Sequence, residues 1–178
     1  MKSILISIKP KWVAKILNGE KTIEIRKTMP KCDLPIDVYI YCTKDKETIA
    51  INPYGGYATI PNKYKNEYFN GKVVAKFTLN KVDKHHVLPT ERILPFNWNV
   101  EQKLKDLCLT KEEVMAYGNG EDYQAFLWHI DNLEIFYRPK RLDDFWSCVK
   151  QVRGKKGTYQ CSRLFKAPQN FCYVEVLL

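Results

Sequence analysis

The chain has 178 residues, a length that suits a single domain and can bury a substantial core without disulfides or metals. Hydrophobic residues make up 45% of it and charged residues 28%, which excludes disordered, collagen-like and fibrous classes. The 29 Lys and Arg residues against 20 Asp and Glu residues give a net charge of +9, and the positive excess lies in residues 1–31 and 138–166. Two basic segments with aromatic residues nearby favour a polyanionic partner, most often a nucleic acid; the alternative is that these charges only solvate the surface.

Several kinds of segment and site are not expected. The apolar runs are only a few residues long and the N-terminus has no signal-peptide core, so we predict no membrane segment and a cytoplasmic location. No Gly-rich phosphate loop is present, so no cofactor is expected, and the oligomeric state is not predicted. The cysteines form no C-x-x-C pair, so we predict no metal site and reduced thiols at Cys32, Cys42, Cys108, Cys148, Cys161 and Cys172.

The N-terminal pattern predicts a strand followed by a helix. Residues 4–8 place isoleucines at alternate positions, as in a strand with a buried face. The helix is expected to begin at Pro10, because proline suits the first helical position, and to end at Asn18-Gly19. Its apolar face contains Trp12, for which the core and a ligand are both possible contacts.

The next segments predict strands joined by turns. Lys21–Lys27 alternates strictly, with isoleucines on one face and polar side chains on the other. Asp37–Cys42 is rich in residues that favour strands, and Lys72–Leu79 follows an Asn70-Gly71 turn. The residues between 44 and 70 have no helical period, so we predict a long ordered loop there.

The second half predicts helices first and strands later. Between Glu101 and Tyr117 the pattern is helical, and Thr110 with Glu113 three residues on forms a capping box. Strands are predicted at Gln124–Ile130, Asn132–Tyr137 and Phe171–Leu177, with a loop or short helix at Pro139–Trp146. Residues 150–157 are expected to form an exposed loop whose phosphate-binding patch is Arg153, Lys155 and Lys156.

The cluster that carries chemistry lies directly after the first helix. Lys21, Glu24 and Arg26 place an ammonium, a carboxylate and a guanidinium within six residues. One interpretation is an exposed strand face with a Glu24–Arg26 pair worth under about 1 kcal/mol. The other is a cleft in which Lys21 is a mobile charge, Arg26 contacts phosphate or a base edge, and Glu24 orients Arg26 or accepts from an exocyclic amine. In that interpretation, replacing Arg26 with alanine weakens binding and barely changes stability.

These residues also carry a family resemblance. The segment Gly19–Arg26 reproduces the G-x-K-x-x-E-x-R motif of the ASCH domain, and Ser7–Trp12 and Asn70–Val74 are similar to other parts of that family. The ending Ala167–Val174 resembles the P-P-Q-S-W-C-Y-V of a bacterial and phage-associated subgroup, with departures at Ala167, Asn170 and Phe171. The resemblance spans both ends and the middle strand, and matches residues 44–69 and 85–157 only loosely.

The resemblance implies a fold and a ligand. The fold is α+β, a closed or nearly closed PUA-like β-barrel of mostly antiparallel strands with flanking helices. It forms one domain over residues 1–178, with loop insertions at about 44–69 and 150–157. The implied ligand is RNA, another nucleic acid or a nucleoside, in a basic cleft around the motif. The side chains expected to bind it are Lys9, Trp12, Lys21, Glu24, Arg26, Lys27, Gln169 and Tyr173.

An enzyme is the alternative that the resemblance leaves open. One ASCH subgroup hydrolyses the acetyl amide of N4-acetylcytidine with a lysine, a threonine and a glutamate. By position that lysine is Lys21, but Glu24 stands where the threonine belongs, Thr22 is offset along the strand, and Glu101 and Asp106 are the nearest candidates for the glutamate. Another relative resembles a ribonuclease, for which Glu24 is the candidate base and Lys21 a phosphate contact. A protein-interaction or structural role is the third class.

Overall fold

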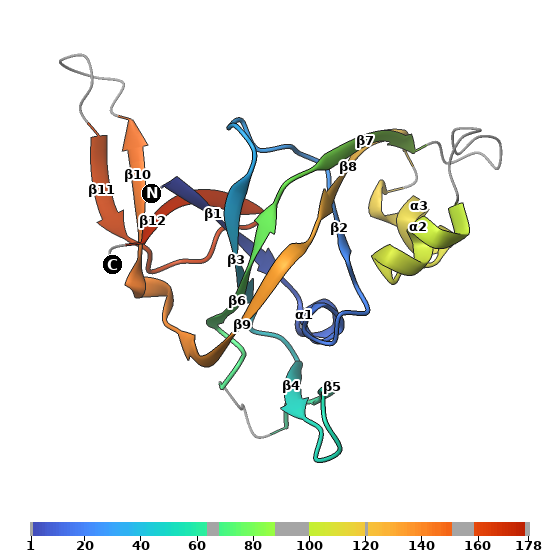
Figure 1. The fold of residues 1–178 in the computed structure, drawn as a ribbon, viewed down its shortest axis with the longest axis horizontal. Coiled ribbons are helices and arrows are strands. Elements are labelled where there is room, and N and C mark those ends of the chain that lie inside the picture. The colour runs from blue at the N-terminus through green and yellow to red at the C-terminus, as the bar shows by residue number, and fades with distance from the viewer. Residues whose placement is uncertain (1, 64–67, 88–99, 120, 151–158, 177–178) are drawn as a thin grey trace.

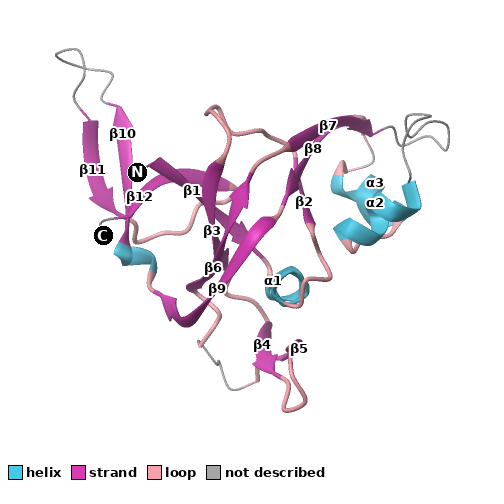
Figure 2. Ribbon diagram, viewed as in Figure 1, coloured by secondary structure: helices cyan, strands magenta, loops and turns pink. Residues whose placement is uncertain are grey.

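The structure is a computed structural model that describes residues 2–63, 68–87, 100–119, 121–150 and 159–176 (Figures 1 and 2). Its elements follow the chain in this order: β1 Lys2–Ile8, α1 Pro10–Leu17, β2 Ile23–Arg26, β3 Ile36–Cys42, β4 Glu47–Ile51, β5 Tyr57–Pro61, β6 Lys72–Leu79, β7 Val82–Val87, α2 Val100–Leu107, α3 Lys111–Tyr117, β8 Tyr123–His129, β9 Asp131–Lys140, a 3-10 turn η1 Leu142–Asp144, β10 Phe145–Lys150, β11 Tyr159–Arg163 and β12 Phe171–Val176.

The strands form three sheets. The largest has the order β11-β10-β12-β1-β3-β6-β9, the second β2-β8-β7, and the third is the β4–β5 hairpin. β1 and β3 pair in parallel, whereas the other described pairs are antiparallel. The predicted α+β class with mostly antiparallel strands is therefore confirmed. The pairing of β1 with β12 also brings the two ends of the chain together.

The described strands do not close into the barrel that was expected. β6 continues into β7 and β8 into β9, so one antiparallel ribbon bends from the largest sheet into the second (Figure 1). β2 pairs with β8, and within the described part of the chain no backbone ladder joins β2 to β1. We call this unpaired side between β1 and β2 the seam. Side chains span it in place of a ladder.

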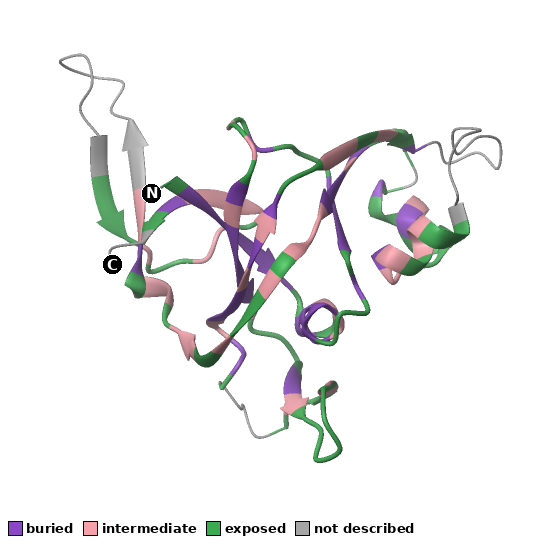
Figure 3. Cartoon of the chain, in the orientation of Figure 1, coloured by how far each residue is buried: buried purple, intermediate pink, exposed green. Residues whose placement is uncertain are grey.

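Strand β2 is buried on both faces, which is unusual for a strand that carries charges (Figure 3). Ile23 and Ile25 pack with Leu107 of α2 and Val114 of α3 in a separate hydrophobic cluster. Because side chains alternate along a strand, Glu24 and Arg26 point away from this cluster, toward the interior lined by the main core. The helices therefore cover one side of β2, and its charges face the seam.

Several predicted elements are confirmed. Helix α1 begins at Pro10 and ends at Leu17, with Asn18 as its C-cap. Gly19 follows with a φ of +73°, a conformation that favours glycine. Thr110 and Glu113 form the predicted capping box of α3. The strands predicted in the first half appear as β1, β2, β3 and β6, and those in the second half as β8, β9 and β12.

The prediction of a loop between residues 44 and 70 is wrong, because this segment contains the β4–β5 hairpin. Its strands are rich in β-branched residues, and Gly55 and Gly56 supply the positive φ values of the reversal. The Asn18 side chain holds the hairpin against the end of α1: its Nδ2 donates to Tyr57 O at 2.8 Å and its Oδ1 accepts from Tyr57 N at 2.8 Å. β7, β10 and β11 were not predicted either. Of the loop or short helix expected at Pro139–Trp146, η1 is the short helix, and β9 and β10 extend into the two ends of that segment.

The prediction of reduced cysteines is wrong at Cys161, which is disulfide-bonded, whereas Cys32, Cys42, Cys108 and Cys172 are free. The β10–β11 register places Cys148 directly opposite Cys161, a juxtaposition that appears only once these two strands are paired. The basic patch Arg153, Lys155 and Lys156 lies outside the described residues. No helix in the described ranges is long and apolar enough to cross a membrane.

One polar cluster joins the second sheet to the helices. The Asp83 carboxylate on β7 is contacted by three nitrogen atoms: His129 Nε2 at 2.8 Å, Lys103 Nζ of α2 at 3.0 Å and Lys81 Nζ at 2.9 Å. Partial burial works to raise the pKa of Asp83, but the hydrogen bonds from its three partners outweigh it and hold this pKa well below its ordinary value. Asp83 thus stabilises the packing of α2 on the sheet while it is ionised.

We expect Asp83→Asn to lower the free energy of unfolding at pH 7 by about 1–2 kcal/mol, as for partly exposed charge-assisted hydrogen bonds. Because the folded pKa is depressed, this contribution is present above the unfolded pKa of about 4 and is lost as pH falls through the folded value. Urea unfolding at pH 7 and pH 3 measures it, with the exposed Asp33→Asn as control. A difference from wild type that is as large at pH 3 as at pH 7 would contradict the assignment.

Candidate functional site

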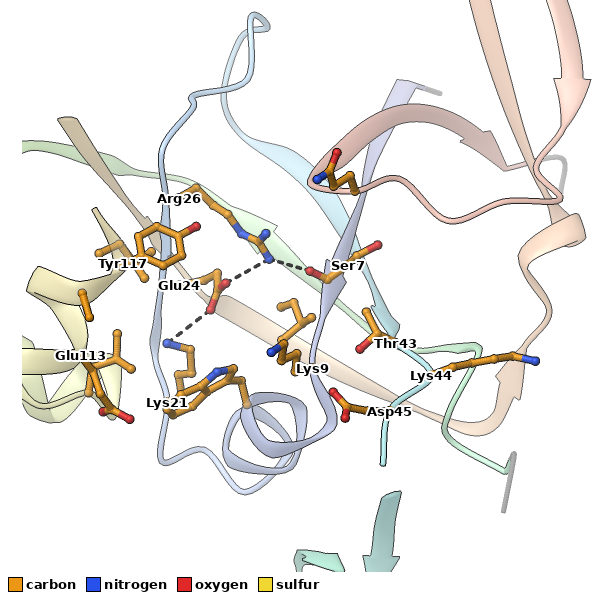
Figure 4. A pocket seen from close by; sticks show the side chains of 16 residues that line it. Ser7, Lys9, Lys21, Glu24, Arg26, Thr43, Lys44, Asp45, Glu113 and Tyr117 are labelled. Carbon is orange, nitrogen blue, oxygen red and sulfur yellow. Dashed lines mark hydrogen bonds and ion pairs between the residues drawn. The ribbon is translucent and has the colours of Figure 1, made fainter. Parts of the chain in front are cut away.

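A pocket of about 620 Å3 opens at the seam (Figure 4). The floor of the pocket is formed by β1, α1 and β2. One side is formed by Gln169 and the segment after β3, and the opposite side by α3. Its lining residues are Ser7, Ile8, Lys9, Trp12, Lys21, Glu24, Ile25, Arg26, Thr43, Lys44, Asp45, Leu109, Glu113, Ala116, Tyr117 and Gln169.

The three motif side chains form one buried ionic array in this pocket. Glu24 Oε2 lies 3.3 Å from Lys21 Nζ, and Glu24 Oε1 lies 3.0 Å from Arg26 Nη2 (Figure 4). Lys21 is 2% exposed, Glu24 7% and Arg26 8%. The interpretation as an exposed strand face is therefore wrong, whereas the expected convergence of the three side chains is confirmed. In this environment the pairs depend on one another, since a buried charge without a partner is costly.

Lys21 is held rather than mobile, contrary to the sequence-based expectation. Its Nζ donates to the backbone oxygen of Leu107 at 2.7 Å, and Leu107 is the last residue of α2. The carboxyl end of a helix carries partial negative charge, which favours an ammonium group. Nζ also lies 5.5 Å from the centre of the Trp12 ring. Lys21 thereby ties α2 to α1 and to the ionic array.

Arg26 spans the seam. Its Nη2 donates to Ser7 O on β1 at 2.8 Å, and its Nη1 donates to Asn170 Oδ1 at 3.1 Å. Asn170 in turn donates to Thr28 Oγ1 at 2.7 Å, so the segment before β12 is fixed against the end of β2. The Nε of Arg26 is buried and has no hydrogen-bond partner among the described residues. One donor of the guanidinium therefore has no partner among the described residues, and it is shielded from solvent in this conformation.

Two aromatic side chains flank the array. Trp12 of α1 packs partly on the main core and also lines the pocket, so its core contact is confirmed and a ligand contact stays a prediction. Tyr117 at the end of α3 lines the opposite wall (Figure 4). Burial raises the pKa of the Tyr117 phenol, against the lowering effect of nearby Arg26. A planar ligand between α1 and α3 would therefore meet an aromatic surface on each side.

The pocket is close to charge balance rather than strongly basic. Its lining includes four cationic side chains, Lys9, Lys21, Arg26 and Lys44, and three carboxylates, Glu24, Asp45 and Glu113. Glu113 also lies 3.6 Å from Lys11 Nζ of α1. No group of three His, Cys, Asp or Glu residues suited to a metal ion occurs in the part of the chain that the structure describes.

Six of the eight predicted ligand-binding residues line the pocket, namely Lys9, Trp12, Lys21, Glu24, Arg26 and Gln169. Lys27 does not, because the alternation of β2 turns it away from Arg26. Tyr173 accepts a hydrogen bond from Lys31 N at 2.6 Å and has Lys2 Nζ over its ring, and it does not line the pocket.

Of the carried-over enzyme candidates, Lys21 and Glu24 line the pocket, whereas Thr22, Glu101 and Asp106 do not. Thr22 is exposed, Glu101 is exposed, and the Asp106 carboxylate accepts from Gln102 on its own helix. Sequence reasoning also missed lining residues from β1, from the segment after β3 and from α3. The helical pattern and the capping box predicted α3, but neither indicates which strand the helix faces.

Among solved structures, the chain is similar in fold to the ASCH protein of Zymomonas mobilis. The crystal structure of a single-residue variant of that protein matches with a TM-score of 0.59 at 17% identity, over 97% of this chain and 88% of that one. The structure titled simply as ASCH from Zymomonas mobilis matches with a TM-score of 0.51 at 17% identity, over 79% and 74%. At this identity the likeness shows the ASCH fold. No family model matches the chain, and no curated protein does.

The geometry predicts that Arg26→Ala is strongly destabilising, which corrects the expectation of a nearly neutral surface change. Its removal leaves Glu24 half-paired and Ser7 O and Asn170 without their donor, at a cost of about 3–5 kcal/mol. Its neighbour Lys27 is exposed, so Lys27→Ala should stay within about 0.5 kcal/mol. Urea unfolding of both variants measures this, and equal midpoints would contradict the buried array.

Proposed function

We propose that the chain is an ASCH domain of the bacterial and phage-associated subgroup that binds RNA in the cytoplasm. It holds one base, or a free nucleoside, in the seam pocket and does not turn it over. The pocket has the size of a small-molecule site, which supports this proposal. The G-x-K-x-x-E-x-R motif lies at its floor, and the ASCH fold agrees with the resemblance carried by that motif.

The observation that carries the proposal is the unused donor of Arg26. A buried polar atom is normally hydrogen-bonded, and Arg26 Nε has no partner in the described protein. A ligand acceptor, such as a carbonyl oxygen or ring nitrogen of a base, satisfies it once a small shift of the Arg26 side chain exposes this atom to the pocket. The Glu24 carboxylate beside it accepts a hydrogen bond from an exocyclic amine of the base. The array thus offers a base edge both hydrogen-bond donors and acceptors.

The charge balance of the pocket favours an uncharged group inside it. Glu24 already neutralises much of the charge on Lys21 and Arg26, which leaves little net attraction for a phosphate at the floor. Exposed lysines stand at the opening, including Lys9 and Lys44. The base therefore enters and the phosphates stay outside near these lysines, as in proteins that bind single strands.

A hydrolase remains the second candidate, because a lysine and a carboxylate lie together in a pocket that also contains the hydroxyl group of Thr43. The existing contacts of Glu24 and Lys21 disfavour the hydrolase. Each Glu24 oxygen is already paired with a cation, and Lys21 Nζ contacts both Glu24 and Leu107 O. A proton-transfer role for either group requires a buried pair to separate first. Binding without turnover needs no such step.

The test is calorimetric titration with adenosine, cytidine, guanosine, uridine and N4-acetylcytidine, and with labelled single-stranded RNA. We expect at least one base to bind, and Arg26→Lys to weaken its affinity about tenfold to a hundredfold, because lysine lacks the Nε donor. Arg163→Lys changes an exposed arginine outside the pocket lining and serves as the matched control.

Chromatography of the same mixtures after incubation separates binding from catalysis, and we expect the ligands to be recovered unchanged. Cleaved RNA or deacetylated cytidine would establish the hydrolase instead. Absence of binding to every nucleoside and RNA, or equal affinity of a folded Arg26→Lys variant, would overturn the proposed site.

A further inference from the structure

We propose that the ligand is a strand of at least two nucleotides, whose second nucleotide binds a subsite formed by Lys27, Tyr117 and Tyr123. This inference rests on the proposed function, because it places the second nucleotide beside a base in the seam pocket. Lys27 directly follows β2, Tyr117 ends α3 and Tyr123 begins β8. We call them the outer subsite.

The outer subsite lies against the pocket through a shared wall. Arg26 faces the pocket, and Lys27, the next residue, faces the other way. Tyr117 contacts both sides: it lines the pocket, and Lys27 Nζ lies 5.3 Å from the centre of its ring. A base in the pocket and a base in the outer subsite would therefore be separated by a single aromatic side chain.

The aromatic surface of this subsite is held in place. Lys27 Nζ lies 5.6 Å from the Tyr123 ring, and the Tyr117 and Tyr123 rings meet edge to face with centres 5.9 Å apart. Tyr123 OH donates to Val114 O of α3 at 2.7 Å. Gly118 lies between the two tyrosines in sequence, and a Cβ there would collide with the Tyr123 ring. The close approach of the Tyr123 ring to the backbone of Gly118 therefore requires a glycine.

The chemistry matches a nucleotide rather than an apolar partner. Tyr117 is 37% exposed and Lys27 is exposed, so part of an aromatic side chain and a cation are both accessible to solvent. Single-strand binding sites combine an aromatic stacking surface with cations that track the backbone. The ammonium now over the two rings can turn to the phosphate that joins the two nucleotides, while the second base stacks on the tyrosines.

The experiment compares the best-binding nucleoside from the panel above with dinucleoside monophosphates that add uridine at its 5′ or its 3′ side. In the wild type we expect one of the two dinucleotides to bind about tenfold more tightly than the nucleoside, the size of one stacked base. Lys27→Met, which keeps the apolar stem, and Tyr117→Leu should each remove most of this gain. Lys63→Met, at an exposed lysine after β5 that does not line the pocket, should leave it unchanged.

The outcomes distinguish the two proposals. A nucleoside that binds as tightly as both dinucleotides overturns the outer subsite and leaves the pocket intact. An unchanged gain in a folded Lys27→Met variant also overturns it. If neither nucleosides nor dinucleotides bind, the proposed function fails together with the subsite. Melting curves of each variant separate lost binding from lost folding, and deoxy versions of the dinucleotides distinguish RNA from DNA.

Discussion

The buried ionic array of Lys21, Glu24 and Arg26 is the interaction on which the site depends. Its two cations link different parts of the fold: Lys21 reaches the end of α2, and Arg26 reaches β1 and the segment before β12. Glu24 joins the two cations. Burial of three charges is costly in general and is tolerated where each finds partners of good geometry. Here the partners are supplied by separate elements, so the array assembles only when the whole fold does.

The array also explains why the seam remains open to a ligand. No backbone ladder joins β1 and β2 in the described part of the chain; one arginine side chain bridges the strands, and the pocket lies beside it. Strand β2 can carry charges inward because its two isoleucines face a separate hydrophobic cluster with α2 and α3. The helices thus compensate for the polar face and at the same time supply the wall that contains Tyr117.

Local sequence signals predicted the elements that depend on local physics. Pro10, Gly19 and Thr110 mark helix ends through backbone conformation and capping, and they are found where expected. Strict alternation identified β2, and its motif located the array. The β4–β5 hairpin was missed because a short two-stranded sheet carries little periodicity and depends on docking to Asn18. The burial of Arg26, the inward wall of α3 and the disulfide of Cys161 depend on contacts between segments far apart in sequence, which no local pattern encodes.

The proposed role of Arg26 Nε as the donor to the ligand can be observed by nitrogen-15 NMR of the arginine side chains. We expect a slowly exchanging Nε–H signal in the free protein, because the group is buried, with Arg26→Lys providing its assignment. Addition of a binding nucleoside should shift this signal more than those of exposed arginines. An Arg26 signal that stays in place while the nucleoside binds would contradict the account.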